Sequence, residues 1–295
     1  MTSATSQPNP TDALLAMLNL DPLASTGQEE IFSAQTLTDE SPRIFGGQVL
    51  AQALMAASRT VEGKQAHSLH AYFLRPGQVE APLSYGVEVL NEGRSFATRR
   101  VQAYQPEAPI FSAIVSFQAQ AAGPDHSASM PQGLPEPESL PRASDILGSL
   151  DIPLAQKVAY TRPIDIRHIS APLYLGPDRQ ASAQNLIWFK TFGPLPDEPA
   201  LHQAALAYAS DYTQIEPLLR RHGQSWVSPG MKVASLDHTI WFHRPARADD
   251  WLLLVQDSPS AQGARGLSLG QIFSRDGVHV ATVAQEAMLR LPDYR

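Results

Sequence analysis

One acid and one hydroxyl in the second half of this chain are suited to activating a water molecule. Asp211 follows the small, apolar run 201–209, which is rich in alanine, the strongest helix former. Ser235 lies in the run 233–243, whose β-branched and aromatic residues predict a strand. A buried helix that ends at a carboxylate, beside a strand that carries a hydroxyl, is therefore a candidate catalytic site.

Each candidate side chain also has a simpler interpretation. Asp211 fits a surface acid at a helix end, and Ser235 fits a polar position that faces solvent. Gln285 fits neither description well, because it lies in the apolar run 278–288 and a buried amide needs hydrogen-bond partners.

Three further polar residues lie on or beside the predicted strand. Asp237 shares a strand face with Ser235 if the side chains alternate regularly. His238 and His243 are five residues apart, so the same alternation puts them on opposite faces and disfavours a metal pair. We favour structural roles for Asp237, His238 and His243.

The composition excludes several classes of site. The 295 residues contain no cysteine, which rules out disulfides, thiolate metal sites and cysteine nucleophiles. A net charge of −7 argues against nucleic acid as a partner, although a local basic patch could still hold an anion. The motifs of serine hydrolases, zinc peptidases and nucleotide-binding loops are absent. We expect neither a metal nor an organic cofactor.

The sequence also lacks targeting and membrane signals. No apolar run approaches the ~18–20 residues of a membrane span. Residues 1–12 contain no lysine or arginine, unlike a secretory or transit segment. We expect a cytoplasmic protein without stable membrane insertion, and we predict disorder for residues 1–10.

The predicted elements repeat along the chain. In each half a helix precedes a strand that ends in a Phe-x-Arg-Pro motif, at Phe73 and again at Phe242, and three more strands follow. The spacers are hairpin-sized and rich in turn residues, which indicates antiparallel meanders and an α+β fold. The helices are predicted at 47–58 and 201–210, with strands at 68–74, 83–90, 95–105 and 110–120, and at 233–243, 251–256, 266–275 and 277–290.

The repeat predicts two domains and a connector. Residues 1–120 form the first helix-plus-sheet unit and residues 155–295 the second, which carries the candidate catalytic residues. The segment 121–154 between them is rich in proline and glycine. We interpret it as a tether that holds at most one short helix, near 142–150.

Several motifs resemble the type II acyl-CoA thioesterases, which have a double-hotdog fold. The resemblance covers about residues 13–291, in the family's order and spacing. The motifs are Arg43-Ile44-Phe45-Gly46-Gly47-Gln48-Val49, His70-Ala71-Tyr72-Phe73-Leu74-Arg75-Pro76-Gly77, Ala207-Tyr208-Ala209-Ser210-Asp211, Leu236-Asp237-His238-Thr239-Ile240-Trp241-Phe242-His243-Arg244-Pro245, Ala264-Arg265-Gly266 and Val283-Ala284-Gln285-Glu286.

This resemblance implies hydrolysis of fatty acyl-CoA to a fatty acid and CoA, as part of lipid metabolism. In the family an Asp, a Thr and a Gln activate the attacking water, and these positions fall on Asp211, Ser235 and Gln285. Ser235 departs from the pattern: it keeps the hydroxyl but lacks the methyl group that restricts χ1 in threonine. Arg265 is a candidate contact for CoA phosphates, whereas Arg220 and Arg221 fit a solvated face better.

Two other functions remain open. One is a non-catalytic protein that binds acyl-CoA or an acyl carrier, in which Ser235 reflects lost catalysis. The other is a hotdog hydratase, which needs an acid and a histidine on one helix; the helix at 201–210 offers His202 but no suitable acid. We also expect a homo-oligomer, either a dimer or a tetramer.

Overall fold

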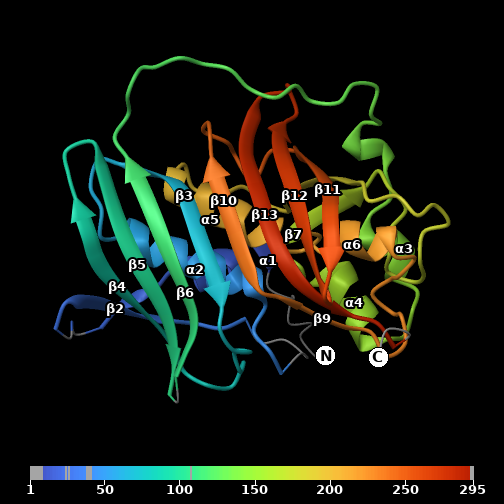
Figure 1. Ribbon diagram of the computed structural model, residues 1–295, viewed down its shortest axis with the longest axis horizontal. Coiled ribbons are helices and arrows are strands. Elements are labelled where there is room, and N and C mark those ends of the chain that lie inside the picture. The colour runs from blue at the N-terminus through green and yellow to red at the C-terminus, as the bar shows by residue number, and fades with distance from the viewer. Residues whose placement is uncertain (1–8, 24, 26, 38–41, 107, 293–295) are drawn as a thin grey trace, which may run out of the picture.

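The computed structural model describes residues 9–292, apart from residues 24, 26, 38–41 and 107. A single antiparallel sheet runs through it in the order β1-β2-β4-β5-β6-β3-β10-β13-β12-β11-β8-β7, and β9 pairs with β13 beside this path. The two longest helices, α2 and α5, lie behind the sheet in Figure 1. The disorder predicted for residues 1–10 falls mostly outside the described residues, and Pro10 already begins a helix.

The first half of the chain forms the strands at one end of the sheet order, from β1 to β3. Its central helix α2 is buried on every face from Gly47 to Ala57, as its nearly continuous apolar sequence predicts. The elements are α1 (Pro10–Leu18), β1 (Asp21–Pro22), β2 (Glu29–Ala34), α2 (Gly46–Ser58), β3 (Gln65–Phe73), β4 (Leu83–Glu92), β5 (Phe96–Gln105) and β6 (Ala108–Gln118).

The second half repeats this layout around α5. The strand predicted at 233–243 is interrupted and forms β9 and β10, and a short helix that the sequence did not suggest, α6, follows α5. The elements are β7 (Ile164–His168), β8 (Asn185–Thr191), α5 (Pro199–Ser210), α6 (Glu216–Arg221), β9 (Lys232–Ser235), β10 (Asp237–Phe242), β11 (Leu252–Gln262), β12 (Arg265–Ser274) and β13 (His279–Arg290).

The two halves join at β3 and β10. These strands pair along five residues, from Asp237 opposite Tyr72 to Trp241 opposite Ser68. Behind the joint, apolar residues of α2 and α5 belong to one hydrophobic core. The predicted α+β architecture is therefore present, with the two half-sheets fused edge to edge.

The proline-rich connector is not the loose tether that the sequence suggested. It arches over one end of the sheet (Figure 1) and contains η1 (Pro137–Ser139), α3 (Ala143–Leu147) and the start of α4 (Pro153–Tyr160). Its Met130 and Leu134 pack against a cluster on the outer face of the second half-sheet. The expected boundary between 154 and 155 falls inside α4, so the connector continues into a helix of the second half.

Candidate active site

Asp211 lies at the buried end of α5. Every residue of this helix from Ala204 to Ser210 is buried, and Asp211 is its C-cap. The carboxylate is only 8% exposed, and its Oδ1 atom has no hydrogen-bond partner among the residues that the structure describes. Leaving a buried oxygen unbonded is unfavourable, which makes Oδ1 a site suited to binding a donor such as water.

A β-bulge brings Ser235 onto the same sheet face as His238. Ser235 pairs with Ala287, but Thr239 pairs with Ala284, so the register shifts by one residue between them. The two residues in the bulge, at 236 and 237, oppose the single residue 286. Regular alternation put Asp237 on the face of Ser235; the bulge puts His238 there instead.

Gln285 connects the side chains on this face. Its Nε2 donates to Ser235 Oγ at 2.8 Å, and its Oε1 accepts from His238 Nδ1 at 2.5 Å. The amide is 1% exposed and also lies close enough to Asp211 to affect its ionisation. The structure therefore brings Asp211, Ser235 and Gln285 together in one cluster, in which Asp211 and Gln285 are buried and Ser235 is half-buried.

The electrostatic environment makes Asp211 a stronger base than an ordinary aspartate. Burial raises the pKa of Asp211, because the charged form loses its hydration. The nearby His238, the backbone N–H of Gly47 and the amide of Gln285 act in the opposite direction without cancelling the rise. A carboxylate with a raised pKa accepts a proton from water more readily.

The first turn of α2, from the other half of the chain, reaches the same carboxylate. A Cβ atom at Gly46 would lie 2.7 Å from Asp211 Oδ2, and a Cβ at Gly47 would lie 2.5 Å from the carbonyl oxygen of Tyr208. Only residues without a side chain allow this approach. The positive end of the α2 dipole and its free N–H groups therefore face the site.

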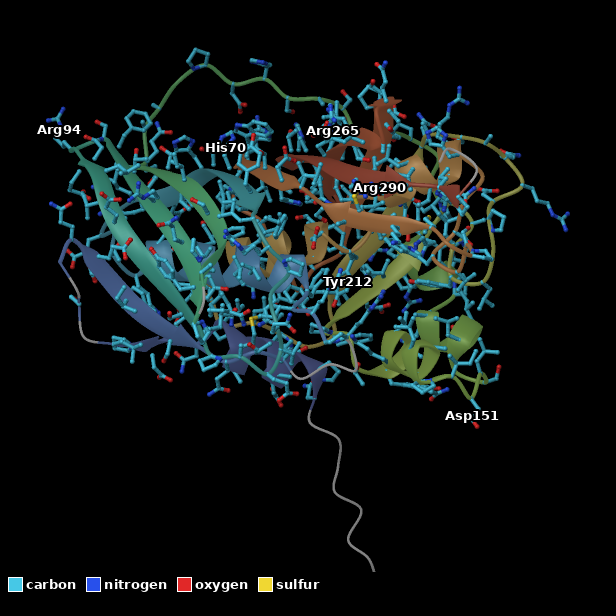
Figure 2. All side chains as sticks on the ribbon, turned by 60° about the horizontal axis from the view of Figure 1, so that its bottom comes forward. His70, Arg94, Asp151, Tyr212, Arg265 and Arg290 are labelled. Carbon is cyan, nitrogen blue, oxygen red and sulfur yellow. The ribbon has the colours of Figure 1, made fainter. Side chains whose placement is uncertain are left out.

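Aromatic rings fix the contact between the two helices. Phe45, the N-cap of α2, stacks on Tyr212 with ring centroids 4.5 Å apart and meets Tyr208 edge-on at 5.2 Å. Tyr212 lies near the middle of the molecule in Figure 2, where the two halves meet. These contacts hold the start of α2 against the end of α5.

His238 has a place in this cluster that the sequence did not reveal. The side chain is fully buried, its Nε2 lies 3.0 Å from Ser210 Oγ, and its Nδ1 lies 4.0 Å from Asp211 Oδ1. The donor at Nδ1 sets the orientation of the Gln285 amide. Regular strand alternation concealed this role, because nothing in the apolar pattern marks the bulge.

Asp237 and His243 lie outside the cluster. Asp237 Oδ1 accepts from the backbone N–H of Glu286 at 2.7 Å, and so satisfies a donor at the bulge. His243 is exposed at the end of β10, where its Nε2 lies 2.8 Å from Thr282 Oγ1. Both contacts fit structural roles.

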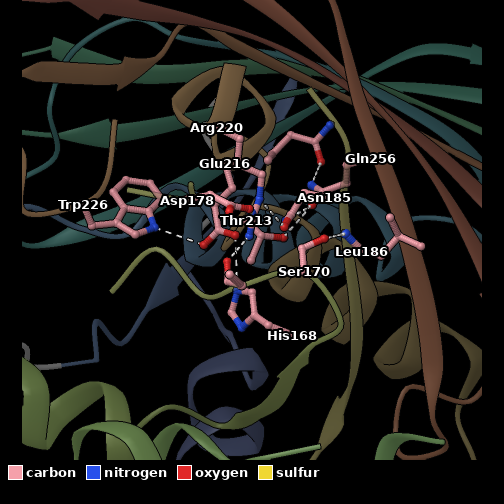
Figure 3. Close-up of polar contacts among 12 residues, drawn as sticks. His168, Ser170, Asp178, Asn185, Leu186, Thr213, Glu216, Arg220, Trp226 and Gln256 are labelled. Atoms are coloured by element: carbon pink, nitrogen blue, oxygen red, sulfur yellow. Dashed lines mark hydrogen bonds and ion pairs between the residues drawn. The ribbon is translucent and has the colours of Figure 1, made fainter. Parts of the chain in front are cut away.

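A buried polar network holds the segment that follows Asp211 (Figure 3). Thr213 Oγ1 donates to Gln256 Oε1 at 3.1 Å, and Glu216 Oε2 lies 3.2 Å from His168 Nε2. Burial alone raises the pKa of Glu216, but His168 and the indole N–H of Trp226 outweigh it, so the pKa falls below its ordinary value.

Arg220 corrects one expectation from the sequence. The sequence favoured a solvated face for this residue, but it is only 1% exposed. Its guanidinium donates to Asn185 Oδ1 at 2.9 Å and to Asp178 Oδ2 at 2.6 Å, as part of the same network. Arg220 is therefore a structural cation, and it is not available to phosphates. Arg221, by contrast, is exposed.

Within the described part of the chain, no group of three or more histidine, aspartate or glutamate side chains could hold a metal ion. Over the same residues, no helix has both the length and the apolar character to cross a membrane.

Two family models match the chain, one in each half. The model described as acyl-CoA thioesterase N-terminal domain matches residues 36–118, and the model described as acyl-CoA thioesterase matches residues 172–288. The second match includes all three candidate catalytic residues.

Curated proteins of similar sequence carry the same description. The chain is 40% identical over 257 residues to acyl-CoA thioesterase 2 from Haemophilus influenzae, covering 85% of this chain and 89% of that one. It is 36% identical over 288 residues to human acyl-coenzyme A thioesterase 8, covering 93% of this chain and 88% of that one.

Solved structures support the fold. Acyl-CoA thioesterase II TesB2 from Mycobacterium marinum superposes with a TM-score of 0.76 at 38% identity, covering 96% of this chain and 99% of that one. A hot dog fold protein from Alicyclobacillus acidocaldarius superposes with a TM-score of 0.74 at 19% identity, covering 95% of this chain and 98% of that one. At this identity the similarity supports the fold alone. The expected double-hotdog fold is confirmed.

Proposed function

Since the chain belongs to the type II acyl-CoA thioesterase family and is an acyl-CoA thioester hydrolase, we propose that Asp211, Ser235 and Gln285 carry out the hydrolysis. The observation that carries this assignment is the buried cluster itself. It joins a carboxylate that has one unbonded oxygen to an amide and a hydroxyl that can orient a water molecule.

Asp211 acts as the general base. It takes a proton from a water molecule whose oxygen attacks the thioester carbonyl carbon, and Gln285 and Ser235 hold the lone pairs of this water toward the carbon. The carbon–sulfur bond then breaks, the electron pair leaves with the sulfur of CoA, and the proton on Asp211 passes to this thiolate. The products are a fatty acid and CoA, without a covalent intermediate.

The start of α2 stabilises the developing negative charge. The carbonyl oxygen gains charge as water attacks, and a preorganised backbone N–H at a helix N-terminus lowers the energy of this state. Gly47 N–H already interacts with Asp211. The adjacent Gly46 N–H, at the first position of the helix, is the donor that we assign to the oxyanion.

A non-catalytic acyl-CoA binding protein is the less favoured alternative. The relatives at 36–40% identity are named as thioesterases, and Ser235 retains its hydroxyl in contact with Gln285.

We further propose that the protein works in fatty acid metabolism in the cytoplasm, as a homo-oligomer that does not bind nucleic acid. The absence of cysteine and the net charge of −7 support the compartment and the lack of nucleic-acid binding. Self-association is supported by large apolar side chains that are exposed on the outer sheet face. They are Tyr72, Ile114 and Leu269, which are 63%, 46% and 43% exposed.

The decisive experiment follows thiol release from acyl-CoAs of increasing chain length by wild type and Asp211→Asn. We expect the variant to lose about 10²- to 10⁴-fold in kcat while it still binds acyl-CoA, since only the proton acceptor changes. Because burial raises the pKa of Asp211, wild-type kcat should fall on acidification at a pH above the ordinary aspartate value of ~3.9. Wild-type turnover by the Asn variant would exclude Asp211 as the base.

A further inference from the structure

Ser268 is a buried hydroxyl beside Gln285 that the proposed mechanism does not use. It lies on β12 directly opposite Gln285 on β13, and residues directly opposite each other project from the same face of a sheet. The side chain is 0% exposed, and its Oγ atom has no hydrogen-bond partner among the residues that the structure describes. A buried hydroxyl without a partner is unfavourable, so Ser268 Oγ is suited to binding a small polar group.

The segment that follows Asp211 covers this hydroxyl. Gly266 and Gly270 flank Ser268 on the same face of β12, where a Cβ at Gly266 would lie 2.1 Å from Leu218 of α6 and a Cβ at Gly270 would lie 3.5 Å from Gln214 Oε1. The side chain of Leu269, between them, points to the other face and is 43% exposed. Ser268 therefore faces the segment 213–218.

Gln214, in this segment, has a donor to spare. It is fully buried, and its Oε1 accepts from Gln256 Nε2 at 2.8 Å, which ties it to the network in Figure 3. Its Nε2 donates to the backbone carbonyl oxygen of Ser268 at 3.3 Å. This is the only bond that Nε2 donates within the described residues, although an amide nitrogen carries two hydrogens. Two groups with unused capacity therefore meet at Ser268.

A water molecule matches both groups. Water both donates and accepts, and a buried water makes two to four hydrogen bonds to polar groups that are otherwise unsatisfied. The space is limited, because Leu218 and Gln214 already occupy the inner face of β12 next to Ser268. A larger ligand would have to displace one of these side chains.

We propose that Ser268 is a further positioning residue of the hydrolysis. Its hydroxyl binds a buried water molecule that it shares with the amide of Gln214, and this water holds the segment after Asp211 against the strand beside Gln285. This assignment rests on the proposed function, because it takes Asp211 and Gln285 as the groups that must be aligned.

The alignment matters because the water joins the neighbours of both catalytic groups. Gln214 follows Asp211 by three residues, and Ser268 pairs with Gln285. Without the water, the contact between Gln285 and Asp211 loosens. The hydrogen bond from Gln285 lowers the pKa of Asp211, so a looser contact raises that pKa, and the misplaced base accepts a proton from water less efficiently.

The first test compares Ser268→Ala with Ser225→Ala in the full chain. Ser225 is a matched control, since it is 1% exposed in the same half and its Oγ has a partner, Ser228 Oγ at 3.4 Å. We expect kcat to fall about tenfold in Ser268→Ala with KM nearly unchanged, and to stay at the wild-type value in Ser225→Ala. An unchanged kcat in Ser268→Ala would overturn the proposal. So would a rise in KM alone, which would place the hydroxyl on the substrate.

The pH profile separates positioning from a purely structural role. The acid limb of kcat should move to higher pH in Ser268→Ala, because the pKa of Asp211 rises, and should stay in place in Ser225→Ala. Asp211 also faces His238, Tyr208 and Tyr212, and Ser268→Ala leaves all three in place. A lower kcat with an unshifted acid limb would contradict the positioning role.

A double-mutant cycle tests whether Ser268 and Gln214 share one water. Gln214→Met removes the amide at similar length. Because either substitution removes the same water, the combined variant should be little slower than the slower single variant. If the two losses multiplied, the two residues would act independently, and the shared water would be excluded.

A high-resolution crystal structure of the full chain without substrate shows the water directly. We expect an ordered water within hydrogen-bond distance of Ser268 Oγ and Gln214 Nε2 in wild type, and none there in Ser268→Ala. A dry site in wild type would overturn the proposal. Asp211→Asn, assayed in parallel, separates the two proposals: its inactivity beside a fully active Ser268→Ala would remove only the role of Ser268, whereas its full activity would remove the proposed function.

Discussion

Strands β3 and β10 occupy corresponding places in the two halves, yet β10 and the adjoining β9 carry the polar residues His238 and Ser235 toward the helices, whereas β3 carries apolar residues there. Each pairs with the last long strand of its half, and each pairing shifts register near its start, between Ala66 and Ser68 in one half and around Leu236 in the other. The backbone that positions the catalytic face therefore exists twice.

The side chains on this backbone differ in kind. The places of Ser235, His238 and Gln285 are taken in the first half by Ala66, Leu69 and Val115, all of them buried in the core. Both helices end in serine, but the C-cap is Arg59 in α2 and Asp211 in α5. Arg59 turns away to donate to Asn19 Oδ1 at 2.9 Å.

This difference shows that the two related units contribute different groups to the same site. In the mechanism proposed above, the second half supplies the side chains that activate water, and the first half supplies the backbone of Gly46 and Gly47 at the same carboxylate. The proposed site therefore uses residues from both units.

The strongest test makes the second half resemble the first by combining Ser235→Ala, His238→Leu and Gln285→Val. We expect kcat to fall about 10²- to 10⁴-fold and the free energy of unfolding to fall as well, because Asp211 stays buried and loses the His238 and Gln285 groups that stabilise its charge. Steady-state kinetics measure kcat, and chemical denaturation measures the free energy of unfolding. Ala66→Ser in the first half is the control and should retain wild-type turnover.

Gly46→Ala tests the contribution of the first half. The new methyl group would lie 2.7 Å from Asp211 Oδ2 and 3.1 Å from the Phe73 ring, so the carboxylate or the helix must shift. A displacement of this size reduces kcat by about 10²-fold. Gly123→Ala is the control: no atom lies near the added carbon, so kcat should not change. If Gly46→Ala also left kcat unchanged, α2 would have no part in catalysis.

His238 should act through Gln285, without touching the substrate. His238→Leu removes the donor that orients the amide, and we expect a loss of about tenfold in kcat with little change in KM. His238→Asn, whose amide can donate from a similar position, should recover part of this loss. If both variants lowered only the melting temperature, the role of His238 would be structural.

The raised pKa of Asp211 should also appear in stability. The folded protein retains the proton in a pH range where the unfolded chain has released it, so wild-type stability falls as pH rises through this range. Asp211→Asn has no such group and should gain stability relative to wild type as pH rises. Denaturation curves over a pH series give the free energy of unfolding of both proteins. If this free energy changed equally with pH in wild type and variant, the prediction would be contradicted.

The smallest effect is expected at Ser235. Ser235→Thr keeps the hydroxyl that Gln285 contacts and restricts its χ1, so turnover should equal or exceed that of wild type. Ser235→Ala should reduce turnover. Thiol-release rates compare the three proteins, and equal rates for serine and alanine would leave the hydroxyl without a catalytic role.

Elements with strong local patterns could be predicted from the sequence. The apolar run of α2 and the alanine-rich α5 were located to within two residues. Gln285 and Ser235 are hydrogen-bonded to each other, while the catalytic roles that the family resemblance implied for them and for Asp211 stay predictions.

Features that depend on distant partners could not be predicted. The bulge after Ser235 adds one residue without changing the apolar pattern, and so it concealed His238. Arg220 is buried because Asn185 and Asp178, far away in the sequence, complete its hydrogen bonds. Met130 and Leu134 looked like parts of a tether because their packing surface belongs to the second half-sheet.

The joint between β3 and β10 also bears on how the chain is synthesised. The ribosome completes the first half early, and until β10 emerges, the edge of β3 presents unpaired backbone groups that can recruit other strands. Gln285 lies on β13, which the chain reaches well after β10. The proposed site therefore forms only after β13 has been synthesised, and the exposed edge of β3 makes the nascent chain prone to association before β10 emerges.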